Sequence, residues 1–67
     1  MQIGLKIAYY RKLNGLTQEQ LAEKIDKSWS FIAQIESVKS KKGISLDTLL
    51  DIAKALQVEP YKFLMFD

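Results

Sequence analysis

Cysteine and histidine are absent from this chain, and proline occurs once among its 67 residues. Without the first two residue types, disulfide bonds, the usual zinc sites and most nucleophilic catalytic sites are excluded. Four carboxylates remain as candidates for acid-base chemistry: Glu19, Glu23, Asp47 and Asp51. Their helical spacing is typical of solvated faces. We therefore predict a protein that is not an enzyme and that binds no metal or other cofactor.

Long apolar runs are absent as well. No run approaches the roughly 18 apolar residues that span a bilayer, and the N-terminus lacks the charged-then-apolar order of a signal peptide. We expect a cytoplasmic protein that does not contact a membrane. With 67 residues, of which 48% are hydrophobic, the chain is expected to form one domain, residues 1–67. So small a core is marginal alone, which favours a homodimer.

A strong charge of either sign is also missing, because 10 basic and 8 acidic residues leave a net charge of only +2. This excess alone is weak evidence for a polyanionic partner. Its distribution is more informative, since residues 11–42 carry seven basic and four acidic side chains and the rest carries three and four. Positive charge therefore gathers around the centre of the chain.

The central stretch, residues 17–37, has the pattern of two short amphipathic helices. Its apolar residues recur with the helical period in both halves: Leu21, Ala22 and Ile25, then Ile32 and Ile35. Between the halves lie Asp26 and Lys27, too few residues for a relaxed loop, so the pattern predicts a helix-turn-helix. Thr17 with Gln20 fits a capping box for the first helix, and Ser28 can cap the second.

The outward face of the second motif helix is polar, uncharged and small. With Ile32 directed inward, Ser30, Gln34 and Ser37 point away from the core at about 100° per residue. On the flanks lie Lys27, Trp29 and Ala33. Such a face suits contact with a partner better than packing in a core.

A helix is predicted over residues 2–13, ended by Asn14 and Gly15, which both tolerate a left-handed backbone. Ile3, Ile7 and Tyr10 form its core stripe, and a second stripe contains Leu5, Tyr9 and Leu13. The second stripe is either a half-buried flank or a contact surface. We keep Leu5 and Tyr9 as candidates for a dimer surface.

The segment after the motif, residues 38–44, reads as a loop with three lysines, Lys39, Lys41 and Lys42. It is either a solvated connection or a phosphate-binding segment. Ser45 is then expected to cap a fourth helix, whose buried face is predicted to be Leu46, Leu49, Leu50, Ala53 and Leu56. Pro60 suits the start of a short fifth helix. Phe63 and Leu64 are expected to close the core, while Met65 and Phe66 either join it or form part of a subunit interface.

Three segments, LTQEQLAEKI, KSWSFIAQIE and SLDTLLDIAKALQV, resemble the XRE-type helix-turn-helix DNA-binding domain of phage repressors, Cro proteins and many small bacterial regulators. The resemblance covers residues 3–64. It implies an all-α fold, a compact five-helix lambda-repressor-like domain. It also implies that the second motif helix, about residues 28–37, lies in the major groove of a palindromic operator.

The resemblance also implies roles for individual residues. Base contacts fall on Trp29, Ser30, Ala33 and Gln34. Contacts to DNA phosphates fall on Gln18, Ser28, Lys39, Lys41 and Lys42. Arg11 and Glu36 match a structural ion pair that joins the first and third helices in relatives. Two positions depart from the family. Asp26 stands where the turn commonly has glycine, but aspartate tolerates a left-handed backbone, so the turn is expected to form at a small cost. Val38 is β-branched and stands near another common glycine position, so the exit from the second motif helix must differ locally or be strained.

Side-chain chemistry supports these base contacts unequally. The Gln34 amide can bind adenine through two hydrogen bonds, whereas the Ser30 hydroxyl discriminates weakly and Ala33 can touch only a thymine methyl group. Trp29 is unusually large for its position. It packs on sugar and methyl groups of DNA, on its own neighbouring helix, or on a protein partner.

The leading hypothesis is therefore a homodimeric transcriptional regulator that binds double-stranded DNA sequence-specifically. The alternative is a protein-interaction module that keeps the helix-turn-helix fold but does not bind DNA. A salt titration against nonspecific duplex separates the two hypotheses, because phosphate contacts make DNA binding strongest at low salt. No small-molecule ligand is evident from the sequence.

Overall fold

The computed structural model describes residues 3–37 and 44–64. In these two ranges the chain forms four α-helices and one 3₁₀ helix: α1 (Ile3–Leu13), α2 (Gln18–Lys24), α3 (Trp29–Glu36), α4 (Leu46–Leu56) and η1 (Pro60–Phe63). The all-α prediction is confirmed, but the fifth predicted helix is a single 3₁₀ turn. Its backbone bonds, Lys62 to Glu59 and Leu64 to Tyr61, both span three residues at 3.0 Å, which is the tighter 3₁₀ pattern.

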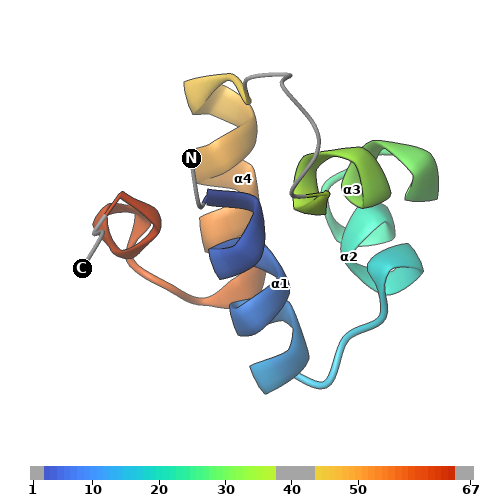
Figure 1. Cartoon of the computed structure of the whole chain (residues 1–67), viewed down its shortest axis with the longest axis horizontal. Helices are drawn as coiled ribbons and strands as arrows, with labels where there is room; N and C mark the ends of the chain where they lie inside the picture. The colour runs from blue at the N-terminus through green and yellow to red at the C-terminus, as the bar shows by residue number, and fades with distance from the viewer. Residues whose placement is uncertain (1–2, 38–43, 65–67) are drawn as a thin grey trace.

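The helices pack around one interior. Figure 1 shows α1 beside α4 at the centre, with α2 and α3 together on one side and η1 on the other. Contacts between α2 and α3 are the most extensive, and α1 contacts α3, α4 and η1. Every helix within the described ranges is too short or too polar to cross a membrane.

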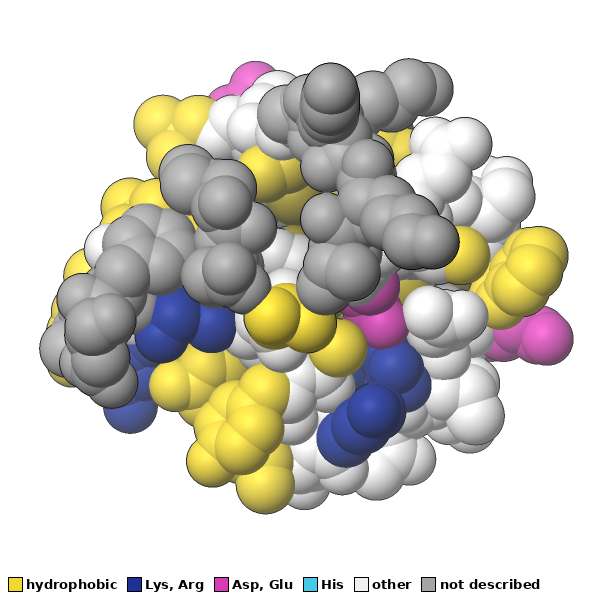
Figure 2. All heavy atoms as spheres, viewed as in Figure 1, with side chains coloured by type: hydrophobic (Ala, Val, Ile, Leu, Met, Phe, Trp, Pro, Cys, Tyr) yellow, Lys and Arg dark blue, Asp and Glu magenta, His cyan; other side chains and the backbone are white. Residues whose placement is uncertain are grey.

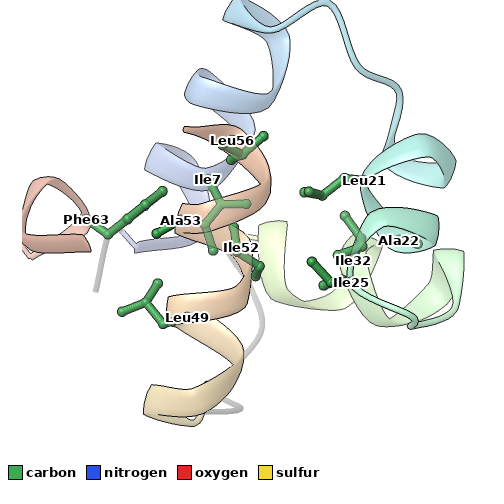
Figure 3. Packing of buried hydrophobic residues seen from close by; sticks show 10 residues of the cluster. All are labelled: Ile7, Leu21, Ala22, Ile25, Ile32, Leu49, Ile52, Ala53, Leu56 and Phe63. Atoms are coloured by element: carbon green, nitrogen blue, oxygen red, sulfur yellow. The ribbon is translucent and has the colours of Figure 1, made fainter. Parts of the chain in front are cut away.

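The core joins residues from all five elements and from the turn after α2 (Figure 3). The largest side chains with at most 1% exposure are Ile7, Leu21, Ile32, Ile52, Leu56 and Phe63. The predicted buried face of α4 was partly wrong, because Leu46 and Leu50 are 65% and 42% exposed. At about 100° per residue they lie on one side of Leu49, while Ile52 lies on the other side, where the core is. Leu64 is also exposed, so the prediction that it closes the core was wrong, and among the described residues at this end Phe63 is the one that closes it.

The predicted helix caps are present. The Thr17 hydroxyl accepts from the Gln20 backbone at 3.1 Å, and the Gln20 side chain accepts from the Thr17 backbone at 2.8 Å, so the capping box is complete. Ser28 accepts from the Phe31 backbone at 3.2 Å, and Ser45 accepts from the Thr48 backbone at 3.2 Å. Polar residues therefore begin α2, α3 and α4 where the sequence pattern placed them.

Left-handed backbone occurs at three described residues, Gly15 with φ 70°, Asp26 with φ 58° and Gln57 with φ 57°. Gly15 follows α1, as expected from its lack of a Cβ atom. Asp26 adopts the conformation that lets the α2–α3 turn form without glycine. Gln57 was not predicted, because glutamine gives no sequence signal for a left-handed helix end.

Gly4 brings the start of α1 against the end of α3. A Cβ atom at Gly4 would collide with the carbonyl oxygen of Ile35 and would lie 3.2 Å from the Cα atom of Glu36. Nothing in the local sequence around Gly4 indicates this contact. In the folded chain it allows two backbones to approach more closely than any side chain would permit.

Candidate nucleic-acid interface

The turn between α2 and α3 sets the angle of the second motif helix. The backbone N–H of Lys27 donates to the Ala22 carbonyl at 2.8 Å, and the N–H of Asp26 donates to the Glu23 carbonyl at 3.2 Å. Ser28 then starts α3 with an extended backbone, φ −85° and ψ 158°. These bonds close the end of α2 before α3 begins, so the chain turns within the four residues between Lys24 and Trp29.

A buried ion pair anchors the other end of α3. Arg11 Nε donates to Glu36 Oε2 at 2.7 Å and Arg11 Nη2 donates to Glu36 Oε1 at 3.0 Å. The remaining guanidinium nitrogen, Nη1, donates to the Leu16 carbonyl at 2.7 Å. The two side chains are only 10% and 5% exposed. Because both charged groups are paired and hydrogen-bonded, they link α1, the loop before α2, and α3.

Gln18, at the start of α2, connects this ion pair to the start of α3. Its Nε2 donates to Glu36 Oε1 at 3.0 Å, and its Oε1 accepts a hydrogen bond from Trp29 Nε1 at 3.1 Å. Both ends of the Gln18 amide are therefore engaged within the protein. Of the three readings for Trp29, the structure shows contact with its own neighbouring helix, while 55% of the side chain stays exposed.

The remaining residues proposed for base contact lie on one side of α3. Ser30 is exposed, and its hydroxyl lies 3.1 Å from that of Ser28, the cap of the helix. Ala33 is partly buried, whereas Gln34 is exposed and its side-chain amide bonds to no other described residue. On the opposite side, Ile32 is fully buried. The helix thus presents a small polar surface outward while its back is fixed in the core.

The charged residues around this surface are only partly described. Lys39, Lys41 and Lys42, as well as Val38, lie outside the described residues. Sequence reasoning did not propose Lys27 for phosphate contact, yet it is exposed directly before the cap of α3, with its ammonium 5.6 Å from the Phe31 ring centroid. Its position one residue before Ser28 was the signal that could have identified it.

The outer stripe of α1 is a second candidate surface. Leu5, Tyr9 and Leu13 are 47%, 58% and 64% exposed. Tyr9 touches Tyr10 edge to face, with ring centroids 5.0 Å apart, and Tyr10 in turn touches Phe63 at 5.5 Å. In Figure 2 apolar side chains reach the surface along α1 and, separately, at the α3 end of the molecule, with charged side chains between them. Met65 and Phe66 lie outside the described residues.

The described residues bring no three metal-ligating side chains together. The described side chains of α3 and its neighbours offer hydrogen-bonding amides, hydroxyls and apolar surface. They are suited to bind a partner through α3.

Comparison with known proteins agrees with this geometry. The family described as helix-turn-helix matches residues 7–63. The immunity repressor protein of Bacillus phage phi105 is 42% identical over 59 residues, which are 88% of this chain and 40% of that protein. Control protein C.SmaI of Serratia marcescens is 38% identical over 55 residues, 82% of this chain and 63% of that protein. The chain therefore spans less than two thirds of the length of these curated relatives.

Two solved structures are also similar. The restriction-modification controller protein C.AhdI from Aeromonas hydrophila has a TM-score of 0.83 and 29% identity, covering 92% of this chain and 87% of that chain. SinR, the master regulator for biofilm formation, was solved in complex with DNA and has a TM-score of 0.84 and 30% identity, covering 94% and 98%. The fold is therefore shared over almost the whole length of this chain.

Proposed function

We propose that this chain, which belongs to the helix-turn-helix family, is a transcriptional regulator. It would bind double-stranded DNA in a sequence-specific way. The observation that carries this proposal is α3, which has one face fixed in the core and an exposed polar face that includes Gln34. A helix of this kind can enter the major groove and read base edges. Two relatives named as repressor or control proteins, and a similar regulator solved with DNA, support it.

Base reading is assigned to Trp29, Ser30, Ala33 and Gln34. Gln34 is the main polar reader, because its exposed amide, which bonds to no other described residue, can donate to and accept from adenine at the same time. Ser30 contributes less discrimination, since a hydroxyl suits either kind of partner. Ala33 is partly buried and offers only a methyl group, which could contact a thymine methyl.

Phosphate contacts are assigned to Gln18, Ser28, Lys39, Lys41 and Lys42, and Lys27 joins them. The side-chain amide of Gln18 already bonds to Glu36 and Trp29, so its contact would come from the backbone N–H in the first turn of α2. The lysines would supply the salt-dependent part of the affinity. Together they would hold α3 in register along the groove.

A homodimer on a two-fold-related operator completes the proposal. The candidate dimer surface is Leu5 and Tyr9, with Met65 and Phe66 from the end of the chain. Tyr9 is connected through Tyr10 to Phe63, so the outer stripe of α1 and the end of η1 lie on neighbouring parts of the molecule. Each subunit measures 29 Å along its longest axis. Since this is less than about 34 Å, one turn of DNA, two subunits could occupy adjacent half-sites without overlapping.

The domain boundaries and location follow from the same proposal. Residues 1–67 would act as one DNA-binding domain without a metal, cofactor or small-molecule ligand. A cytoplasmic location is part of the proposal, because the relatives come from a bacterium and a bacterial phage, and bacterial DNA lies in the cytoplasm.

Selection of bound sequences from a random duplex pool tests the function directly. We expect a two-fold-symmetric consensus whose half-sites are about one helical turn apart. A salt titration against an unrelated duplex is the companion measurement. No binding to any duplex at low salt would reject DNA binding in favour of the protein-interaction alternative.

A further inference from the structure

We propose that Trp29 reads the 5-methyl group of a pyrimidine, thymine in ordinary DNA, at one position of each half-site, and that Gln18 positions the indole for this contact. This inference rests on the DNA-binding function proposed above. It adds the chemical class of the group that the start of α3 recognises. It also assigns to Gln18 a role other than side-chain contact with phosphate.

The hydrogen bond of Trp29 decides what its exposed surface can do. The indole has a single polar group, the Nε1–H, which donates to Gln18 Oε1 at 3.1 Å. The side chain is nevertheless 55% exposed. Because the donor is engaged inside the protein, only apolar ring surface remains for a partner. In the major groove the one apolar group on the base edges is the thymine methyl.

Gln18 holds the indole against a rigid part of the molecule. Its Nε2 donates to Glu36 Oε1 at 3.0 Å, and Glu36 is fixed by two bonds from Arg11. The chain of contacts thus runs from the exposed indole to a buried ion pair. A ring ordered before binding loses less conformational entropy when it meets DNA, so its contact contributes more to affinity.

The neighbours of Trp29 divide the face of α3 into two edges. Ala33, one helical turn after Trp29, extends the apolar edge with its methyl group. Ser30 and Gln34 form the polar edge, and the Ser30 hydroxyl lies 3.1 Å from that of Ser28. The apolar edge suits a methyl group, while the polar edge offers Gln34 to an adjacent base pair.

Deoxyuridine substitution tests the proposal, because uracil differs from thymine only by the missing methyl group. A duplex obtained by the random-pool selection is remade with each thymine replaced singly by deoxyuridine. Dissociation constants are measured for the wild-type protein, for Trp29→Ala and Gln18→Ala, and for the control Gln34→Ala. Circular dichroism melts of all variants confirm that they are folded.

For the wild-type protein we expect about fourfold weaker binding when one particular thymine per half-site loses its methyl group, the effect of burying one such group. Gln34→Ala should keep this ratio although its overall affinity falls. Trp29→Ala should bind the thymine and deoxyuridine duplexes equally. Gln18→Ala should lower the ratio toward one, whereas a merely structural role of Gln18 would weaken both duplexes alike and leave the ratio unchanged.

Two results would overturn the inference, and they differ from each other. If the wild-type protein and Trp29→Ala respond identically to every deoxyuridine duplex, Trp29 does not read a methyl group although DNA is bound. If the random pool yields no bound duplex at all, the proposed function fails and the inference falls with it.

Discussion

The guanidinium of Arg11 donates two hydrogen bonds, of 2.7 and 3.0 Å, to the carboxylate of Glu36 inside the protein. Arg11 lies near the end of α1 and Glu36 is the last residue of α3. The pair therefore ties the orientation of α3 to the central helix. Gln18 also donates to Glu36 and accepts a hydrogen bond from Trp29. The Glu36 carboxylate at the end of α3 is therefore connected, through Gln18, to Trp29 at the start of α3.

Glu36→Ala should lower the free energy of unfolding by about 3–5 kcal/mol, because it leaves the Arg11 charge buried without its partner. Urea denaturation followed by circular dichroism measures this change. Glu23→Ala, an exposed glutamate on α2, is the matched control and should shift stability by no more than about 0.5 kcal/mol. Equal stabilities for the two variants would show that the pair contributes nothing.

Gly4→Ala should destabilise the protein by about 1–3 kcal/mol, the typical cost of overpacking, although alanine is the better helix former. The new Cβ atom would collide with the Ile35 carbonyl oxygen, which belongs to the backbone and cannot rotate away. Thermal melts compare it with Gly15→Ala, where φ is 70° and nothing lies within 4 Å of the added atom. There only the left-handed strain of about 1–2 kcal/mol remains. A Gly4→Ala protein more stable than wild type would contradict the close packing of α1 on α3.

Gln57→Gly should raise the free energy of unfolding by up to about 1 kcal/mol. Gln57 ends α4 with φ 57°, a conformation that costs a residue with a Cβ atom about 1–2 kcal/mol and costs glycine nothing. The greater freedom of glycine in the unfolded chain offsets part of the gain. Glu59→Gly, at a residue with φ −62°, is the control and should lower stability. A loss of stability in both variants would refute the strain at Gln57.

Gln34→Ala should lower the affinity for one DNA sequence, whereas Lys41→Ala should lower the affinity for all sequences. Loss of the Gln34 amide should cost about 1–3 kcal/mol at one base position of the selected duplex and little on a scrambled one. Loss of the Lys41 charge should weaken both duplexes alike and reduce the salt slope by about 0.9. Fluorescence anisotropy at several salt concentrations distinguishes the two. Equal losses on both duplexes for Gln34→Ala would remove it as a base reader.

Tyr9→Lys should convert a homodimer to monomers and weaken operator binding, because it places a charge in the candidate dimer surface. Sedimentation equilibrium measures the dimer dissociation constant. Leu50→Lys on α4, which is 42% exposed, is the matched comparison and should leave the dimer intact. If Leu50→Lys dissociates the dimer and Tyr9→Lys does not, the subunits meet through α4 instead.

Local features of the fold could be predicted because they depend on residues close in the sequence. The capping box of Thr17 and Gln20, and the cap at Ser28, each involve residues three apart, so their bonds follow from side-chain type and spacing. The left-handed turn at Asp26 was expected for the same reason. The face of α3 that turns outward also followed from helical periodicity alone.

Features that depend on the direction of the core could not be predicted in the same way. Leu46 and Leu50 flank Leu49 on one side of the helix and Ile52 flanks it on the other, and the packing of α1, α2 and η1 against α4 decides that Ile52 is the buried one. The need for glycine at Gly4 arises from the approach of Ile35 in α3, which lies 31 residues later in the chain.

By itself, the sequence determined the helices, their caps and the polar face of α3, because periodicity and capping are short-range. Only the tertiary structure showed that the side chains of Gln18 and Trp29 are hydrogen-bonded to each other. The indole donor and the amide acceptor come from different helices and meet only after α2 has folded against α3. The sequence left three possible contacts for Trp29, and this hydrogen bond shows that its indole is held by the neighbouring helix with apolar ring surface exposed. The reason is that hydrogen bonds between distant residues depend on how helices pack, which local pattern does not encode.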